Sequence, residues 1–133
     1  MVRRIAREIA LQALFQLDFT GWEGDVAAAV SAAAGEHEAK YALKAVDYAT
    51  ILVTGVQTNR EALDGQITAA SNGWSLERMG VTDRNILRLA VYEIRHDVDV
   101  SVAINEAVEL AKIYCDDRAP KFINGVLGAV VKA

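Results

Sequence analysis

The chain has 133 residues, a formal net charge of −4, and a composition of 53% hydrophobic and 24% charged residues. This balance is typical of one folded globular domain and not of a disordered protein. The single cysteine excludes an intrachain disulfide and a cysteine-based metal site. No apolar stretch approaches the ~20 residues that cross a bilayer, and the N-terminus does not resemble a secretory signal, so we expect a cytoplasmic protein.

The first half of the sequence is predicted to form three helices. Residues 2–18 place apolar side chains at helical spacing along one broad sector, which predicts an amphipathic helix. Asp25 is expected to cap a short alanine-rich helix that ends at Gly35. Residues 38–57 then continue the helical pattern as a longer element.

The second half is predicted to hold about four more helices. Thr58 or Asn59 is expected to cap the first of them. Thr82 and Ser101 are expected to cap the next two. Pro120 falls near the first turn of the last helix, where its missing N–H costs nothing. Short links join these helices without a low-complexity tract, so one compact bundle-like domain is expected.

Positive charge is concentrated at the start of the first helix. Arg3, Arg4 and Arg7 stand in its opening turns. Residues 1–17 hold three arginines and one glutamate, a net charge of +2, which leaves −6 on the rest of the chain. The first turn of a helix already carries a partial positive charge, so each cation there costs about a few tenths of a kcal/mol. This arrangement favours an anionic partner, and RNA or DNA phosphate is the leading candidate.

An aromatic residue shares this side of the helix. Arg4, Leu11 and Phe15 are spaced by seven and four residues, so they lie along one strip. A guanidinium group can pair with phosphate, and an exposed ring can stack on an unpaired base. The alternative is a solvated basic helix start with Phe15 turned into the core. The helix dipole and the acidic background favour RNA binding.

Three further arginines, Arg84, Arg88 and Arg95, lie within about 40° of one another on the helix after Thr82. They lie opposite the apolar face of that helix, so we expect them on a solvated surface. A second basic binding surface is the alternative.

Residue types typical of catalysis are scattered along the sequence. His37 and His96 lack the neighbours of a catalytic or metal-binding motif, and both are expected at the surface. Cys115 is expected to be a small packed residue and not a nucleophile. Paired carboxylates at Asp116 and Asp117 could do acid–base chemistry, but we expect them to end a helix or to contact a basic partner. We therefore expect no cofactor, no metal and no enzymatic activity.

Five blocks of sequence, spread in order over nearly the whole chain, match the pattern of a known family. They are RRIARE (residues 3–8), LVTGV (residues 52–56), DRNILRLA (residues 83–90), VAINEAVELAK (residues 102–112) and KFINGVL (residues 121–127). In this order they resemble the NusB family of transcription antitermination factors. The fourth block is the most specific, and residues 20–40 match poorly.

The resemblance implies an all-α fold, a single compact domain (residues 1–133) of about seven helices packed as two small helical bundles. It also implies a non-enzymatic role in bacteria. Members of the family pair with NusE, a small-subunit ribosomal protein, and bind with it the boxA element of nascent single-stranded RNA. This assembly helps RNA polymerase to read through terminators, notably in ribosomal RNA operons. Relatives are monomers or homodimers, so both states stay open here.

The resemblance also implies a set of binding residues. The RNA contacts that it implies are Arg3, Arg4, Arg7, Phe15, Lys121 and Phe122. For Phe122, the helical pattern favours the core whereas the resemblance favours partial exposure. Asp83 is the acidic residue that we expect to contact the partner protein.

Two other functions stay open. The chain could be the RNA-binding domain of a larger RNA methyltransferase, although it ends at Ala133 without a Rossmann-like segment for a methyl donor. It could also be a protein-only interaction scaffold whose arginine face binds an acidic protein.

Overall fold

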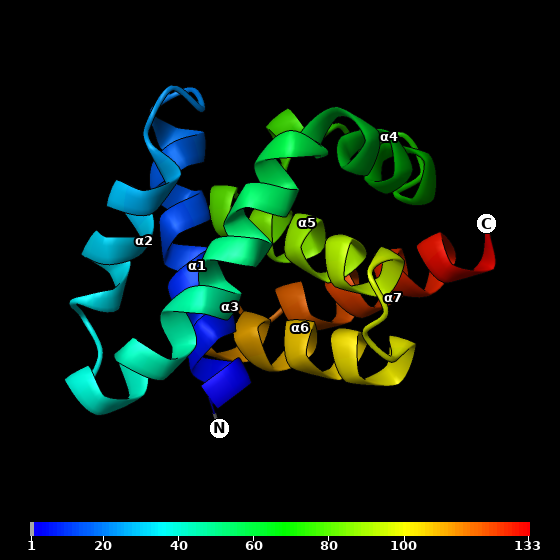
Figure 1. Ribbon diagram of the computed structural model, residues 1–133. Helices are drawn as coiled ribbons and strands as arrows, with labels where there is room; N and C mark the ends of the chain where they lie inside the picture. Colours follow the sequence, from blue (N-terminus) through cyan, green and yellow to red (C-terminus); the bar gives the residue numbers. More distant parts are fainter. Residues whose placement is uncertain (1) are drawn as a thin grey trace. The chain divides into compact units, whose positions relative to one another are not determined.

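The structure, a computed structural model, describes residues 2–133, which form seven α-helices and one short 3-10 helix. The helices are α1 (Val2–Phe19), α2 (Val26–Ala34), α3 (Ala39–Thr58), α4 (Arg60–Ala70), η1 (Leu76–Arg78), α5 (Val81–Arg95), α6 (Val100–Tyr114) and α7 (Ala119–Lys132) (Figure 1). The prediction of an all-α fold with about seven helices is confirmed. Of the helices in the described part of the chain, none is long and apolar enough to cross a membrane.

The helices form two compact units, Met1–Thr58 and Asn59–Ala133. The first contains α1, α2 and α3, and each of these helices contacts the other two. The second contains α4 to α7 together with η1. Within it, α5 and α7 contact each other, and both contact α4 and α6. The two small helical bundles that the resemblance implied are therefore present.

The first unit is held together by the apolar side of α1. Ile9, Leu14 and Leu17 are fully buried, as are Val30 of α2 and Leu52 of α3. Burying each of these side chains contributes about 1.5–3 kcal/mol. The core therefore depends on the helical spacing of apolar residues that the sequence showed for residues 2–18.

The predicted start of α2 is confirmed in detail. The Asp25 carboxylate accepts a hydrogen bond from the backbone N–H of Ala28 at 3.0 Å, which satisfies one of the free N–H groups of the first turn. The helix ends at Ala34, directly before Gly35, as expected. A side-chain cap thus decides where this short helix begins.

Helix α5 is the most buried element of the second unit. Every residue from 85 to 91 is buried, and the helix contacts α4, α6 and α7. Its fully buried Ile86, Leu87 and Leu89 share the core with Ile67 of α4 and Ile123 of α7. Because helices lie on more than one side of α5, little of its surface is left for solvent.

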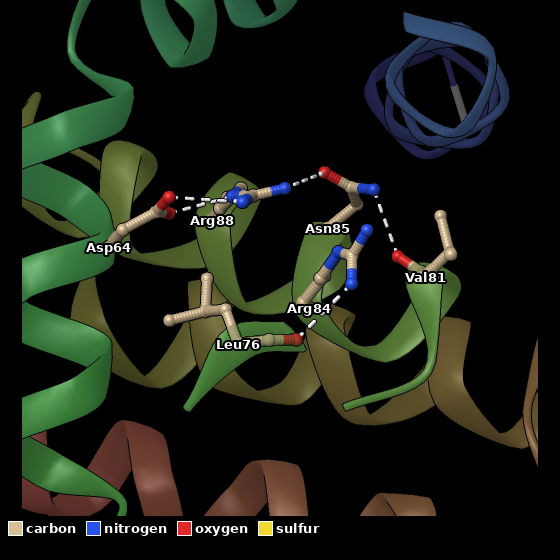
Figure 2. Close-up of polar contacts among 6 residues, drawn as sticks. All are labelled: Asp64, Leu76, Val81, Arg84, Asn85 and Arg88. Atoms are coloured by element: carbon tan, nitrogen blue, oxygen red, sulfur yellow. Dashed lines mark hydrogen bonds and ion pairs between the residues drawn. The ribbon is translucent and has the colours of Figure 1, made fainter. Parts of the chain in front are cut away.

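A polar network inside this unit corrects one expectation from the sequence. Arg88 is buried, and its Nε and Nη2 donate to the two carboxylate oxygens of Asp64 at 2.7 and 3.0 Å (Figure 2). Its Nη1 donates to Oδ1 of Asn85 at 3.0 Å, and Nδ2 of Asn85 donates to the Val81 carbonyl at 2.9 Å. The prediction that Arg88 lies on a solvated face is therefore wrong. The paired carboxylate on α4 stabilises the charge in a buried place.

The two other arginines of α5 lie nearer the surface. Nη1 of Arg84 donates to the carbonyl oxygen of Leu76 at 3.2 Å, which links α5 to η1 (Figure 2). Arg95 is exposed, and its Nε donates to Oε1 of Gln66 on α4 at 2.9 Å. For Arg95 the expected solvated position is confirmed.

Two predicted helix caps are displaced in the structure. Helix α5 begins at Val81 with Gly80 in the cap position, so Thr82 lies inside the first turn. Helix α6 is capped by Asp99 and not by Ser101, because Asp99 Oδ1 accepts the backbone N–H of Ser101 at 2.9 Å. The Ser101 hydroxyl also donates to this oxygen, and the hydrogen bonds hold the pKa of Asp99 below its ordinary value. A carboxylate two residues upstream thus replaces the expected serine.

The start of α4 follows the prediction in position but not in mechanism. Asn59 occupies the cap position, and its side chain makes no capping hydrogen bond. Pro120 lies in the first turn of α7, as expected from its missing N–H.

Asp64→Ala is expected to lower the free energy of unfolding by about 2–3 kcal/mol, because it leaves the buried Arg88 guanidinium without its carboxylate. The loss is smaller than for a fully buried pair, since the Asp64 side chain is 28% exposed and water reaches it. Urea denaturation followed by circular dichroism measures the change.

Asp117→Ala is the control for this prediction, because it removes an exposed carboxylate of the same unit. We expect it to change the free energy of unfolding by less than about 0.5 kcal/mol. Equal losses in the two variants would contradict a stabilising role for the Asp64–Arg88 pair.

Candidate nucleic-acid interface

The arginine-rich start of α1 places two cations at the surface. Arg3 and Arg4 are both exposed. The Cζ atom of Arg3 lies 4.2 Å from the ring centroid of Tyr48, a half-buried residue of α3. A guanidinium group over an aromatic ring keeps N–H donors at its edge, where an anion can reach them. The packing of α3 on α1 thus holds one of the predicted phosphate contacts in place.

Arg7 differs from these two arginines. Only 5% of its surface is exposed, so its guanidinium group lies within the fold. The sequence placed Arg7 beside Arg4 on one basic face, and the structure separates the two by burial. A phosphate contact by Arg7 stays a prediction, and it requires the long side chain to reach out from a buried position.

The far end of α1 carries two exposed aromatic rings. Phe15 is 41% exposed, so the alternative in which it turns into the core is wrong. Phe19, one helical turn further on, is 74% exposed. The rings are nearly parallel, with an interplanar angle of 7° and centroids 6.4 Å apart. Sequence reasoning missed Phe19, although its spacing of four residues from Phe15 indicated a shared side of the helix.

These observations define a surface on α1, which we call the α1 strip: Arg3, Arg4, Phe15 and Phe19. All four side chains come from one helix of the first unit, and all four are exposed. The strip combines cations at one end with aromatic rings at the other. This is a combination that binds phosphates and unpaired bases.

The remaining predicted residues belong to the second unit. Lys121 is exposed in the first turn of α7. Phe122 is half-buried, as the resemblance implied, and not fully in the core as the helical pattern suggested. Asp83, the expected partner contact, is half-buried in the first turn of α5. Three of the expected binding residues, Lys121, Phe122 and Asp83, therefore belong to this unit.

Phe122 and Asp83 line one cleft of about 370 Å³, which we call the α5–α7 cleft. Its other lining residues are Trp74, Arg78, Met79, Gly80, Asp116, Arg118 and Ala119. Trp74 is 53% exposed, and sequence reasoning missed it. A tryptophan in a polar turn, outside any helical repeat, was the available signal. The cleft offers aromatic surface and charges of both signs, which suits a protein or nucleotide ligand.

The Cys115 thiol interacts with Asp83, one of the residues that line this cleft. Burial raises the pKa of its thiol to about 12, helped by a hydrogen bond to Asp83 and by the negative charges of Asp83 and Asp116. Asp116 Oδ1 also accepts the backbone N–H of Arg118 at 2.9 Å, where the chain enters α7. The expectation that Asp116 marks a helix boundary is confirmed, although it precedes α7 and does not simply end α6.

The two histidines take no part in either surface. His37 is half-buried and lies 3.2 Å from Oε1 of Gln12, whereas His96 is exposed and stacks on Tyr92 with centroids 4.0 Å apart. Within residues 2–133, no group of three or more histidine, cysteine, aspartate and glutamate side chains is placed to hold a metal ion.

Cys115 is expected to react with iodoacetamide at pH 8 at least about a hundredfold more slowly in the folded protein than in urea, because the thiol stays protonated. Asp83→Asn removes a negative charge and so lowers the pKa, and alkylation should be faster in this variant than in the original protein. Mass spectrometry of the alkylated protein measures the alkylation rates.

The same raised pKa lowers the free energy of unfolding above about pH 9, because only the unfolded chain then releases the thiol proton.

Asp117→Asn is the matched control, because Asp117 lies two residues from Cys115 but is not among the groups that raise its pKa. We expect its alkylation rate to equal that of the original protein. Identical rates in the Asp83→Asn and Asp117→Asn variants would contradict the contact between Asp83 and the thiol.

Comparison with known proteins gives concordant results for sequence and fold. The sequence model described as "NusB family" matches residues 4–132. The transcription antitermination protein NusB of Desulfitobacterium hafniense (strain DSM 10664 / DCB-2) is 45% identical over 135 residues, which cover 100% of this chain and 90% of that protein.

Two solved structures show the same arrangement. T. maritima NusB matches with a TM-score of 0.85 at 35% identity, over 98% of this chain and 90% of that one. A chain from a crystal structure of antitermination factors NusB and NusE in complex with dsRNA matches with a TM-score of 0.83 at 29% identity, over 98% of this chain and 96% of that one.

Proposed function

The chain belongs to the NusB family, and we propose on this basis that it is a transcription antitermination factor of the bacterial cytoplasm. It acts as a non-enzymatic adaptor that binds boxA-type single-stranded RNA together with the ribosomal protein NusE. The resulting assembly with RNA polymerase promotes read-through of terminators, notably in ribosomal RNA operons. The relative solved with NusE and dsRNA supports RNA and NusE as the partners.

The observation that carries this proposal is the α1 strip. Arg3 and Arg4 stand at a helix N-terminus, where the backbone disfavours cations, and they stand there in a protein of net charge −4. Phosphate oxygens would offset this repulsion by charge-assisted hydrogen bonds. Phe15 would then stack on an unpaired base beyond the phosphates. Arg7 is the third proposed phosphate contact, reaching from its buried position.

The second unit supplies the other proposed contacts. Lys121 would bind a phosphate, because its side chain is exposed at the start of α7. Phe122 would contact the RNA with the part of its ring that faces the α5–α7 cleft. Asp83 lines the same cleft and would meet a basic group of NusE. Asp83 also contributes to the raised pKa of the Cys115 thiol.

The protein alone is expected to bind RNA weakly. Two exposed arginines release few counterions, and the remaining negative charge of the protein repels the phosphate backbone. NusE would complete the RNA-binding surface and so raise the affinity. A homodimer, in which the same surface is covered by a second copy, is the alternative state of the free protein.

The double variant Arg3→Ala/Arg4→Ala is expected to reduce the salt dependence of RNA binding, because two phosphate contacts are lost. The slope of log K against log salt concentration should decrease in magnitude by about 1.4, at about 0.7 for each phosphate of a single strand. Fluorescence anisotropy with a boxA RNA and a scrambled RNA, with NusE present and at several salt concentrations, measures it.

Lys112→Ala/Lys132→Ala is the matched control, since it removes two exposed positive charges from other helices. Its salt slope should equal that of the original protein. Equal slopes for all three proteins would overturn the assignment of Arg3 and Arg4. If the protein binds NusE with the same affinity in the presence and absence of RNA, a protein-only scaffold is favoured instead.

Tyr48→Leu is expected to weaken RNA binding about two- to fivefold, because the loss of the ring removes a cation–π contact worth about 0.5–1 kcal/mol that orients Arg3. Tyr48→Phe keeps the ring and should bind RNA within about twofold of the original protein. Anisotropy measures the affinities, and thermal unfolding shows whether both variants stay folded. Equal affinities for the two variants would show that the ring does not position Arg3.

A further inference from the structure

Two aromatic rings on α1 lie parallel and outside the core. Phe15 and Phe19 are 41% and 74% exposed, whereas Leu11, Leu14 and Leu17 on the same helix are at most 2% exposed. Single exposed apolar residues are common and need no explanation. Two neighbouring rings with an interplanar angle of 7° are different, because they expose aromatic area together at one place on the helix.

Phe19 continues the line that Arg4 and Phe15 form along one side of α1. At about 100° per residue, Arg4, Phe15 and Phe19 lie within about 60° of one another around the helix. Along the axis, about 1.5 Å per residue puts Phe19 about 22 Å beyond Arg4. A single RNA strand that follows the strip from its cationic end therefore meets Phe15 first and Phe19 second.

We propose that Phe19 is a second base-stacking residue, which carries an unpaired RNA base beyond the one that stacks on Phe15. This inference rests on the proposed RNA-binding function and extends its surface by one nucleotide. The two rings are nearly parallel, with an interplanar angle of 7° and centroids 6.4 Å apart, so bases that stack on them also lie nearly parallel, as neighbouring bases of one strand do.

The chemistry of the strip favours an RNA base over an apolar peptide as the ligand. Arg4 lies on the same side of α1 as the rings, and a phosphate backbone neutralises its charge whereas an apolar peptide does not. Every base offers a π face, so this contact adds affinity with little dependence on sequence.

The test combines protein variants with abasic RNA in the presence of NusE. Phe19→Leu keeps an apolar side chain without the ring, and Phe19→Trp enlarges the ring. Both changes are at an exposed position, so the fold should be retained, and thermal unfolding checks this. The RNA is a boxA oligonucleotide in which each base in turn is replaced by an abasic site.

We expect Phe19→Leu to bind the intact RNA about fivefold to a hundredfold more weakly, and Phe19→Trp to bind it at least as tightly as the original protein. At one position of the RNA, the abasic site should lower the affinity of the original protein, whereas Phe19→Leu should bind the abasic and the intact RNA equally. At a different position, Phe15→Leu should bind the abasic and the intact RNA equally. Leu43→Ala removes a 79% exposed apolar side chain from α3 and should change nothing.

The outcomes separate this inference from the proposed function. If Arg3→Ala/Arg4→Ala reduces the salt slope while Phe19→Leu binds every RNA like the original protein, the stacking role of Phe19 is overturned and the RNA-binding function stands. If the original protein does not bind RNA even with NusE, both fail. If Phe19→Leu weakens binding of NusE alone by the same factor, the rings contact a protein and the inference is wrong.

Discussion

One side of α1 must be buried for the first unit to fold, and this requirement decides which of its residues reach solvent. Ile9, Leu14 and Leu17 are fully buried, and each contributes about 1.5–3 kcal/mol to the core. A helix is stiff, so the burial of these three residues sets the direction of every other side chain along it. Phe15 and Phe19 therefore face outward, on the helix whose first turn holds the exposed arginines. The burial of α1 thus places Arg4, Phe15 and Phe19, which belong to the proposed RNA surface, on its outer side.

In the second unit, a buried charged side chain helps to fix the position of α5. Arg88 is joined to Asp64 by two hydrogen bonds and to Asn85 by a third, so α5 is tied to α4 through polar groups as well as through its apolar residues. The first turn of α5 carries Asp83, which lines the α5–α7 cleft with Phe122. An adaptor protein does not need a deep pocket, because its partners supply much of the binding surface. It does need a few charged and aromatic side chains held at fixed positions.

Much of the fold and part of the site could be predicted from the sequence. The period of the apolar residues predicted the helices to within a few residues at each end, since that period follows from helix geometry alone. Local chemistry predicted the cap at Asp25 and the position of Pro120. The exposed Arg3 and Arg4 could be found for the same reason, because charge density and helix position are both properties of the sequence. The family resemblance rested on ordered blocks of residues and needed no coordinates.

Only the tertiary structure decided which polar residues are buried and which apolar residues stay exposed. The sequence placed Arg88 on a solvated face, but α4 covers that face and provides Asp64, which is 24 residues away in the chain. Arg7, which the sequence placed on a basic face beside Arg4, is also buried. The physical reason is that periodicity shows which side chains share one side of a helix. Whether another helix covers that side depends on packing between segments far apart in sequence.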